Sequence, residues 1–518
     1  MNTPNRITLN GALFAFLILS LSVSAQAQSA LRTSHSIQEE ERESPDHQRS
    51  PGDDTTRRLL FWNGVALNAN ALDHALARPD QGGPLRTARA FAIVHIAMFD
   101  AFNAIVGGFK SYTGLEPASS DEDINCDRSR ASVGAAIAQA AGDTLIALYP
   151  FQAKVIEAIQ RVDLKRIPNG SAKAAGIRIG RLAANAILAL RSNDGSQQPE
   201  PEYAVDLNGD GIFYTPNPAP LGKWRPDPVS TTPDKPGPAL GALWNRVQPF
   251  VIRSARQFSV APPPDLTSKE YAEAFNEVKR LGGDGVVTPT KRTADQTIIG
   301  IFWAYEGTPL LGTPPRLYNQ IAVKISKQMR TSGIELARLL ALLNVAMADA
   351  GLACWDTKYR EEFWRPITAI RQGENDDNPD TIGDPNFVPL GSPASNTNRP
   401  NFTPPFPSYT GGHATFGGAL FQILRRFYRT DRIAFVFISD ELNGVTRDNK
   451  GMARPLIPRH FRSLSQAEEE NGQSRVYLGI HWSFDNTEGI KQGNRVADYV
   501  FGNSFWPRTH RRGLTDEQ

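Results

Sequence analysis

One long apolar segment without an internal proline constrains the fold of this 518-residue chain more than any other feature. The segment begins at Ser332, reads SGIELARLLALLNVAMADAGLACWDTKYREEFW, and is followed by its first proline at Pro366. Apolar residues at three- and four-residue spacing predict an α-helix, whose interior excludes proline. Ser332 and Glu335 have the spacing of a capping box, which predicts the start of the helix. We therefore expect one long, largely apolar helix here.

Helical patterns also occur on both sides of this segment. The same spacing recurs before it in LLFWNGVALNANALDHALA, LRTARAFAIVHIAMFDAFNAIV, ASVGAAIAQAAGDTLIALY and AAGIRIGRLAANAILAL, and after it in ATFGGALFQILRRFY and SQAEEENGQSRVYLGIHW. No stretch alternates strongly enough to predict a sheet. The expected fold class is all-α, with two helical bundles joined by long Pro- and Gly-rich loops.

Composition places the boundaries of these bundles. Residues 28–56 are polar and charged, and predict a flexible linker. We expect the first helical bundle over residues 57–195 and a loop-rich connection over 196–265, where proline and glycine are frequent. A second, catalytic bundle is expected over 266–510, and the long apolar helix belongs to it.

The first residues have the pattern of an export signal over residues 1–27. A weakly basic start precedes an apolar run from Leu13 to Val23, and a small-x-small pattern ends at Ala27. We expect cleavage after Ala27, with an uncleaved N-terminal anchor as the alternative. No later stretch reaches about 18 uninterrupted apolar residues, so we expect no transmembrane segment in the mature chain.

Charge and cysteine content exclude several classes of protein. Lys and Arg total 56 against 54 Asp and Glu, a net charge of +2, so no nucleic-acid partner is expected. The two cysteines, Cys126 and Cys354, are too few for a disulfide framework or a four-thiolate zinc site. A single bridge between them stays open, although Cys354 lies in an apolar helical pattern typical of a small buried residue.

Three short motifs in the second half combine into a candidate site. They are Lys358 with Arg365-Pro366, then Gly411-Gly412-His413, then Ser474-Arg475 with His481 and Asp485. The seven-residue separation predicts that both cations of the first motif share one helix face. Singly, each motif is explained by an exposed face, a helix start or a local hydrogen bond. Together, three cations, glycine N–H groups and two histidines suit a tetrahedral oxyanion.

These motifs resemble those of the type 2 phosphatidic acid phosphatase and vanadium haloperoxidase superfamily. K-x6-RP and SR-x5-H-x3-D match at every motif position, whereas the PSGH motif stands here as Thr410-Gly411-Gly412-His413. Stretches such as WNGVALNANALDHA, RTADQTIIGIFWAYEG and LGIHWSFDNTEG resemble the haloperoxidase branch over roughly residues 60 to 505. The resemblance implies a vanadate cofactor, with hydrogen peroxide, a halide and an organic acceptor as reaction partners.

The resemblance also implies a role for each motif residue. Vanadate oxygens would be held by Lys358, Arg365, Arg475 and the Gly412 N–H, with His481 bonded to vanadium. His413 would help to deprotonate hydrogen peroxide, and Lys358 would assist the reaction as negative charge leaves. The halide pocket would be formed by Trp355 and Phe406. Asp295 would orient one arginine, and Asp485 would support His481.

Two other functions remain open at this point. On the same scaffold an acid phosphatase would use His481 as its nucleophile, with Asp485 supporting it and His413 protonating the leaving oxygen. Alternatively, the altered second motif would leave a secreted scaffold that no longer binds vanadate. Gly411 replaces the family's serine and so removes a hydroxyl donor, which predicts weaker retention of vanadate.

Overall fold

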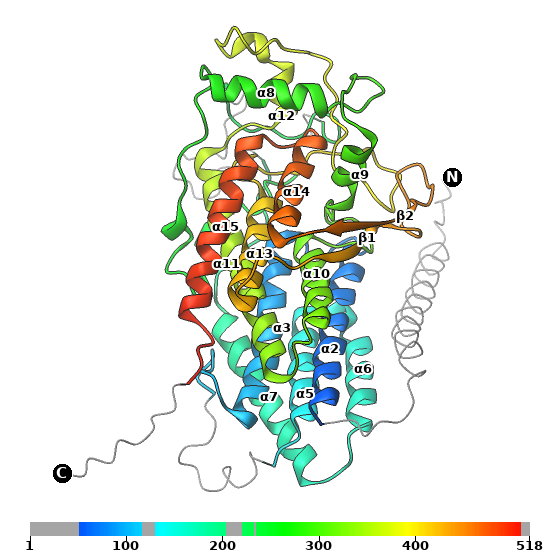
Figure 1. Cartoon of the computed structure of the whole chain (residues 1–518), viewed down its shortest axis with the longest axis vertical. Coiled ribbons are helices and arrows are strands. Elements are labelled where there is room, and N and C mark those ends of the chain that lie inside the picture. Colours follow the sequence, from blue (N-terminus) through cyan, green and yellow to red (C-terminus); the bar gives the residue numbers. More distant parts are fainter. Residues whose placement is uncertain (1–50, 116–129, 204–219, 233–234, 509–518) are drawn as a thin grey trace, which may run out of the picture.

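The protein consists mostly of helices, which run largely along the long axis of the molecule (Figure 1). The computed structural model describes residues 51–115, 130–203, 220–232 and 235–508. Within these ranges the strands form a single two-stranded ribbon, so the expected all-α class is confirmed. The expected signal segment and Cys126 lie outside the described residues.

The first bundle is built from five helices of the described chain. They are α2 (Pro51–Asp73), α3 (Gly83–Val106), α5 (Val133–Leu148), α6 (Ala153–Lys165) and α7 (Ser171–Arg191), with a 3₁₀ turn at Pro150–Gln152. α2 begins at Pro51 rather than at residue 57, so the last part of the segment expected to be a linker is helical.

The second bundle contains the longest helix of the described chain, α11 (Gly333–Glu361). The other helices are α8 (Lys269–Leu281), α9 (Ala294–Phe302), α10 (Pro314–Gln328), α12 (Pro366–Arg371), α13 (Gly412–Tyr428), α14 (Leu464–Tyr477) and α15 (Ser483–Asn503). Short 3₁₀ turns lie at Trp244–Arg246, Ala255–Phe258 and Gly373–Asn375. The capping box expected at Ser332 does not form, because the Ser332 side chain makes no cap hydrogen bond. The first N–H of the helix, that of Gly333, donates to Thr56 Oγ1 (2.9 Å) from the first bundle.

One large hydrophobic cluster extends through both bundles. α11 packs against α3 of the first bundle and against α13 and α15 of the second. Phe99, Leu340 and Leu420 belong to the same buried cluster. Cys354 on α11 is also buried and carries a free thiol. The candidate site is therefore mounted on a helix that both bundles hold in place.

α11 also anchors the loop-rich connection through a buried carboxylate. Asp349 accepts the backbone N–H groups of Phe250, Val251 and Ile252 at 2.7, 2.7 and 2.9 Å. Three charge-assisted hydrogen bonds fix this loop firmly against the helix. The connection is thus an ordered wall of the molecule along this stretch.

Two helices are long and apolar enough to cross a membrane by length and composition, namely α3 and α11. Within the most hydrophobic part of each helix, 83% and 100% of the residues are buried inside the protein. The packing of both bundles around these helices therefore accounts for their apolar composition.

A small antiparallel ribbon was not expected from the sequence. β1 (Phe435–Asn443) pairs with β2 (Leu456–Phe461), and Phe435 lies opposite Phe461. Phe435 and Phe437 face the core, but Val436 and Ile438 are apolar as well although they are 38% and 43% exposed. The alternation of polar and apolar residues that marks a strand is therefore absent.

α11 ends before the second cation of the first motif. Glu362 has left-handed backbone angles (φ 49°, ψ 32°), and its N–H caps the helix at Lys358 O. Arg365 is extended (φ −83°, ψ 154°), as expected for a residue that precedes a proline, and forms the N-cap of α12. The prediction that Lys358 and Arg365 share one helix face is wrong, because the turn between them redirects the chain.

Candidate active site

Three buried cations meet where α11, α12, α14 and the N-termini of α13 and α15 come together. Lys358, Arg365 and Arg475 are each fully buried, although they come from three different helices or helix caps. Two carboxylates accompany them, Asp485 and Glu306, so these five groups carry one excess positive charge when all are ionised. Buried charges require compensation, and an excess positive charge favours an anionic ligand.

His481 is held as the tautomer with a proton on Nδ1. Its Nδ1 donates to Asp485 Oδ2 (2.7 Å), and Nε2 accepts from Arg365 Nη1 (2.8 Å). Burial lowers the pKa of His481 well below its ordinary value, and the nearby charge of Arg365 lowers it further. The imidazole is therefore neutral, with the Nε2 lone pair directed towards the cations.

The His481–Asp485 pair forms at the start of a helix, not within one. His481 precedes the N-cap Trp482 of α15, and Asp485 sits in the first turn, where it also accepts the Trp482 N–H (3.1 Å). A carboxylate in the first turn is favoured by the positive end of the helix dipole. Asp485 therefore contacts His481, as the resemblance implies, and a helix N-terminus creates the contact.

Ser408 completes this pair and was not assigned a role from the sequence. Its hydroxyl donates to Asp485 Oδ2 (2.5 Å) and lies 3.3 Å from His481 Nδ1. Burial raises the pKa of Asp485, and the Ser408 hydrogen bond opposes that effect. Ser408 lies three residues before Gly411 in PFPSYTGGH. This closeness to the second motif is the sequence feature that could have identified it as a site residue.

Lys358 holds the loop that leads into α13. Its ammonium donates to the carbonyl oxygens of Pro407, Ser408 and Thr410 at 2.9, 2.8 and 2.5 Å. Burial lowers the pKa of Lys358, and the charge of Arg365 lowers it further. A bound oxyanion would replace one of these acceptors, because an ammonium has only three N–H donors.

The Gly411-Gly412-His413 stretch forms the N-terminus of α13. Gly411 is the N-cap with ordinary extended angles (φ −67°, ψ 119°), and its N–H donates to Asp485 O (2.9 Å). The next N–H groups have no acceptor within the helix and therefore suit an anion. A Cβ at Gly412 would lie 3.2 Å from the Trp355 ring, so a glycine lets the ring and the backbone approach closely.

His413 lies at the same helix start and borders the cavity described below. Its Nε2 donates to Ala304 O (2.6 Å), so in the neutral ring Nδ1 carries the lone pair. Burial lowers the pKa of His413 well below its ordinary value, and the charge of Arg475 contributes in the same direction. His413 is therefore a neutral base rather than an imidazolium.

Glu306, not Asp295, is the acid that orients an arginine of the site. Asp295 is 67% exposed and pairs with Arg459 (2.8 Å), because the N-terminus of α9 faces strand β2. Glu306 lies in the loop after α9, forms an ion pair with Arg475, and lies 3.7 Å from His413 Nε2. The prediction for Asp295 is wrong, although Glu306 stands eleven residues later in the same quoted stretch, RTADQTIIGIFWAYEG.

Trp355 and Phe406, which the resemblance assigns to a halide pocket, lie together over the cations. Their ring centroids are 5.0 Å apart, and Lys358 Nζ lies 5.5 and 5.1 Å from the two ring centroids. The Arg365 guanidinium is 5.0 Å from the Phe406 ring. The rings shield the cations from solvent and stabilise them through cation–π contacts.

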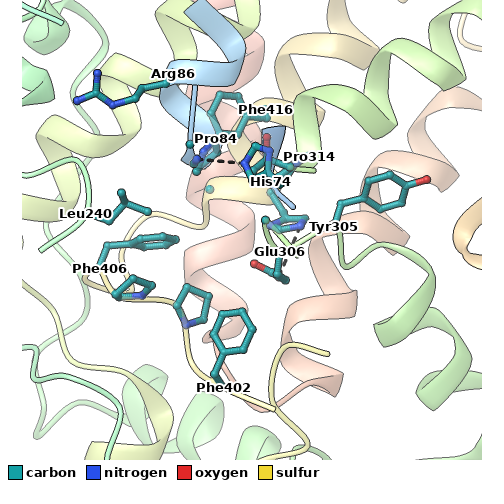
Figure 2. A pocket seen from close by; sticks show the side chains of 18 of the residues that line it. His74, Pro84, Arg86, Leu240, Tyr305, Glu306, Pro314, Phe402, Phe406 and Phe416 are labelled. Carbon is teal, nitrogen blue, oxygen red and sulfur yellow. Dashed lines mark hydrogen bonds and ion pairs between the residues drawn. The ribbon is translucent and has the colours of Figure 1, made fainter. Parts of the chain in front are cut away.

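A cavity of about 490 Å³ leads to this cluster and is bordered by both bundles (Figure 2). Its inner part is formed by Trp355, Phe406, Gly412, His413, Arg475 and His481. The first bundle contributes His74, which is buried. Its Nδ1 donates to Asn70 O and its Nε2 accepts the Gly83 N–H, so this histidine has a structural role.

The residues fit a bound vanadate. Arg365 Nη2 and Arg475 Nε are buried and have no hydrogen-bond partner among the described residues. Leaving guanidinium N–H groups buried and unpaired is costly, which points to an acceptor that is bound there during function. Planar guanidinium donors, helix N-terminal N–H groups and one imidazole lone pair together match a tetrahedral oxyanion of a metal that accepts nitrogen.

Comparisons with known proteins agree with this class of site. The vanadium chloroperoxidase N-terminal domain matches residues 49–200, and the VCPO second helical-bundle domain matches residues 338–505. A vanadium chloroperoxidase from Curvularia inaequalis is 33% identical over 501 residues, which covers 84% of this chain and 80% of the relative.

Solved structures support the fold. A bacterial vanadium-dependent iodoperoxidase matches with a TM-score of 0.66 at 22% identity, over 90% of this chain and 100% of that one. The holo form of a bacterial vanadium-dependent chloroperoxidase matches with a TM-score of 0.57 at 16% identity, over 81% of this chain and 92% of that one. The fold and site thus define a helical-bundle enzyme with a buried oxyanion centre. The chain belongs to the vanadium haloperoxidase family, and its cofactor is vanadate.

Proposed function

We propose that this protein is an exported enzyme that oxidises a halide with hydrogen peroxide to hypohalous acid. The observation that carries the proposal is the neutral His481, whose Nε2 lone pair lies beside guanidinium groups with unpaired N–H donors. Vanadate would be held by His481 Nε2, by Arg365, Arg475 and Lys358, and by the Gly412 N–H. Bound vanadium(V) supplies Lewis acidity that withdraws electron density from the peroxide.

The residues around the site supply proton transfer and exclude water. His413 Nδ1 accepts a proton from incoming hydrogen peroxide, because the neutral ring retains its lone pair there. Trp355 and Phe406 give the halide a dry, apolar surface next to the cations. A weakly hydrated anion is stabilised by such a surface more readily than a strongly hydrated one.

The competing phosphatase function requires His481 Nε2 to attack phosphorus, and the same pocket would accept phosphate. The aromatic pair over the cations favours halide chemistry, because phosphate ester hydrolysis has no need of it. The test is bromination of monochlorodimedone by vanadate-loaded enzyme with peroxide and bromide, measured beside hydrolysis of para-nitrophenyl phosphate. Bromination that depends on vanadate, peroxide and bromide is expected, whereas phosphatase activity alone would contradict the proposal.

Export is supported by the apolar run and small-x-small pattern of residues 1–27. Expression of the full chain in a bacterial host should yield protein in the periplasm or the medium that begins at Gln28. Retention of the intact N-terminus in the membrane fraction would instead indicate an uncleaved anchor. The choice of halide is settled by running the bromination assay with chloride and iodide in place of bromide.

A further inference from the structure

The cavity above the oxyanion site is much larger than a halide and a peroxide require. Its volume of about 490 Å³ lies within the range of pockets that bind drug-sized molecules, roughly 300–1,000 Å³. Each of the small reactants needs about the volume of one or two waters, on the order of 30–60 Å³. The remaining space is sufficient for an organic molecule with an aromatic ring.

The walls of this outer space are apolar. They are formed by Leu240, Phe402, Pro404, Pro405, Phe406 and Phe416. Several of these side chains face one another across the cavity in Figure 2. Flat, rigid rings and prolines of this kind stack on an aromatic ligand with little loss of side-chain entropy.

Besides Arg475 at the oxyanion site, two arginines border the cavity, and their environments differ. Arg86 donates to the carbonyl oxygens of Ser196 and Gln198 and pairs with Glu200 at 3.4 Å, so its charge is compensated. Arg399 is exposed, and within the described part of the chain its side chain has no hydrogen-bond or ion-pair partner. A free guanidinium beside an apolar wall is complementary to a carboxylate attached to a ring.

We propose that this outer cavity binds the organic acceptor, and that the acceptor is an electron-rich aromatic carboxylate. The carboxylate pairs with Arg399, and the ring lies between Leu240 and the aromatic residues. The proposal rests on the haloperoxidase function proposed above. Hypohalous acid transfers its halogen to a ring carbon: the C–halogen bond forms, the C–H bond breaks, and the oxygen leaves with two protons as water. Halogenation then occurs before hypohalous acid escapes to solvent.

A competition experiment separates bound from free halogenation. Vanadate-loaded enzyme brominates an equimolar mixture of para-hydroxybenzoate and para-hydroxybenzamide. The first carries a negatively charged carboxylate and the second a neutral amide in its place. The product ratio is divided by the ratio that reagent hypobromous acid gives under the same conditions. We expect a value of about ten in favour of the carboxylate, the fold-change expected of one charge-assisted hydrogen bond. A value of one would overturn the proposal.

Substitutions of Arg399 test whether the preference for the carboxylate depends on its guanidinium group. R399Q should return the normalised ratio to about one, whereas R399K should keep part of the preference because the charge remains. R432Q is the matched control, since Arg432 is exposed but does not border the cavity. A ratio that is unchanged in R399Q, or lowered equally in R432Q, would contradict the role of Arg399.

Binding without turnover distinguishes this proposal from the proposed function. Fluorine NMR of para-fluorobenzoate, with enzyme but without peroxide or halide, should show line broadening that para-hydroxybenzoate reverses and that R399Q abolishes. An enzyme that brominates monochlorodimedone but does not broaden this signal has the proposed function without the acceptor site. An enzyme that broadens the signal but brominates nothing lacks the proposed function while retaining the binding site.

Discussion

Two fully buried histidines, His95 in the first bundle and His481 in the second, show how the same residue serves stability or chemistry. His95 Nδ1 lies 2.7 Å from Phe91 O, and Nε2 lies 2.9 Å from Asn63 Oδ1. Neither His95 nor Asn63 leaves a buried side-chain polar atom without a partner in the described chain. Around His481, by contrast, Arg365 Nη2 and Asp485 Oδ1 are buried and unpartnered.

The difference shows that burial alone does not mark a functional histidine. Both imidazoles are kept neutral by burial, which lowers the pKa of His95 to about 4 and that of His481 well below its ordinary value. In the first bundle no buried side-chain polar atom of the pair lacks a partner, so the two residues stabilise the fold. In the second bundle hydrogen-bonding capacity remains free and is available to a ligand.

The largest expected effect is the loss of the imidazole at the oxyanion site. We expect H481A to weaken vanadate binding by more than about a hundredfold, because the nitrogen that we propose binds vanadium is removed. The circular dichroism spectrum should stay nearly unchanged, and vanadate affinity is measured by calorimetry. H95A is the matched control and should lower the melting temperature while leaving vanadate affinity unchanged. Equal affinities of H481A and the parent protein would contradict the site assignment.

The next effect concerns the hydroxyl that holds Asp485 beside His481. We expect S408A to weaken vanadate binding by about 10- to 100-fold, the usual cost of losing a hydrogen bond that orients a metal ligand. The alanine leaves Asp485 Oδ2 with one donor fewer in a buried position. S408T retains the hydroxyl and should recover most of the affinity. If S408A and S408T behaved alike, the hydroxyl would have no positioning role.

A separate effect, on stability rather than on vanadate binding, is expected at acidic pH. The pKa of His95 falls from about 6.5 in the unfolded chain to about 4 in the folded protein. The unfolded state therefore binds more protons between these values, so this stability is present above pH 6.5 and is lost as the pH falls towards 4. For this one histidine, the pKa difference contributes roughly 3 kcal/mol to the free energy of unfolding at neutral pH. The melting temperature should fall less between pH 7.5 and pH 4.5 in H95Q than in the parent protein. An equal fall in the two proteins would contradict this role of His95.

Much of the site was predictable from the sequence because short motifs carry its chemistry. The structure brings together Arg365, Gly412, His413, Arg475 and His481, which lie up to 116 residues apart in the chain. The seven-residue spacing wrongly predicted that Lys358 and Arg365 lie on one helix. Pro366 indicated that the helix ends before it. The roles given to these residues by the resemblance remain predictions that the variants test.

Other features were not predictable because tertiary contacts create them. Glu306 reaches Arg475 only through the loop after α9, whereas Asp295 faces strand β2. The ribbon of β1 and β2 lacks an alternating pattern because residues on both of its faces are apolar. Arg399 borders the same cavity as Trp355 and Arg475, although these residues lie far apart in the chain. Local sequence does not contain this information.

The smallest expected effect returns to Gly411, which replaces the family's serine. Its φ of −67° tolerates any side chain, so a substitution adds no left-handed strain. A Cβ there would lie 3.2 Å from Asp485 O and 3.3 Å from Asn486 Oδ1, which requires small shifts of both neighbours. G411A and G411S share this cost, and only the serine adds a donor. We therefore expect G411S to bind vanadate up to about tenfold more tightly than G411A. Calorimetry on the two variants isolates the hydroxyl, and equal affinities would show that it makes no hydrogen bond to vanadate.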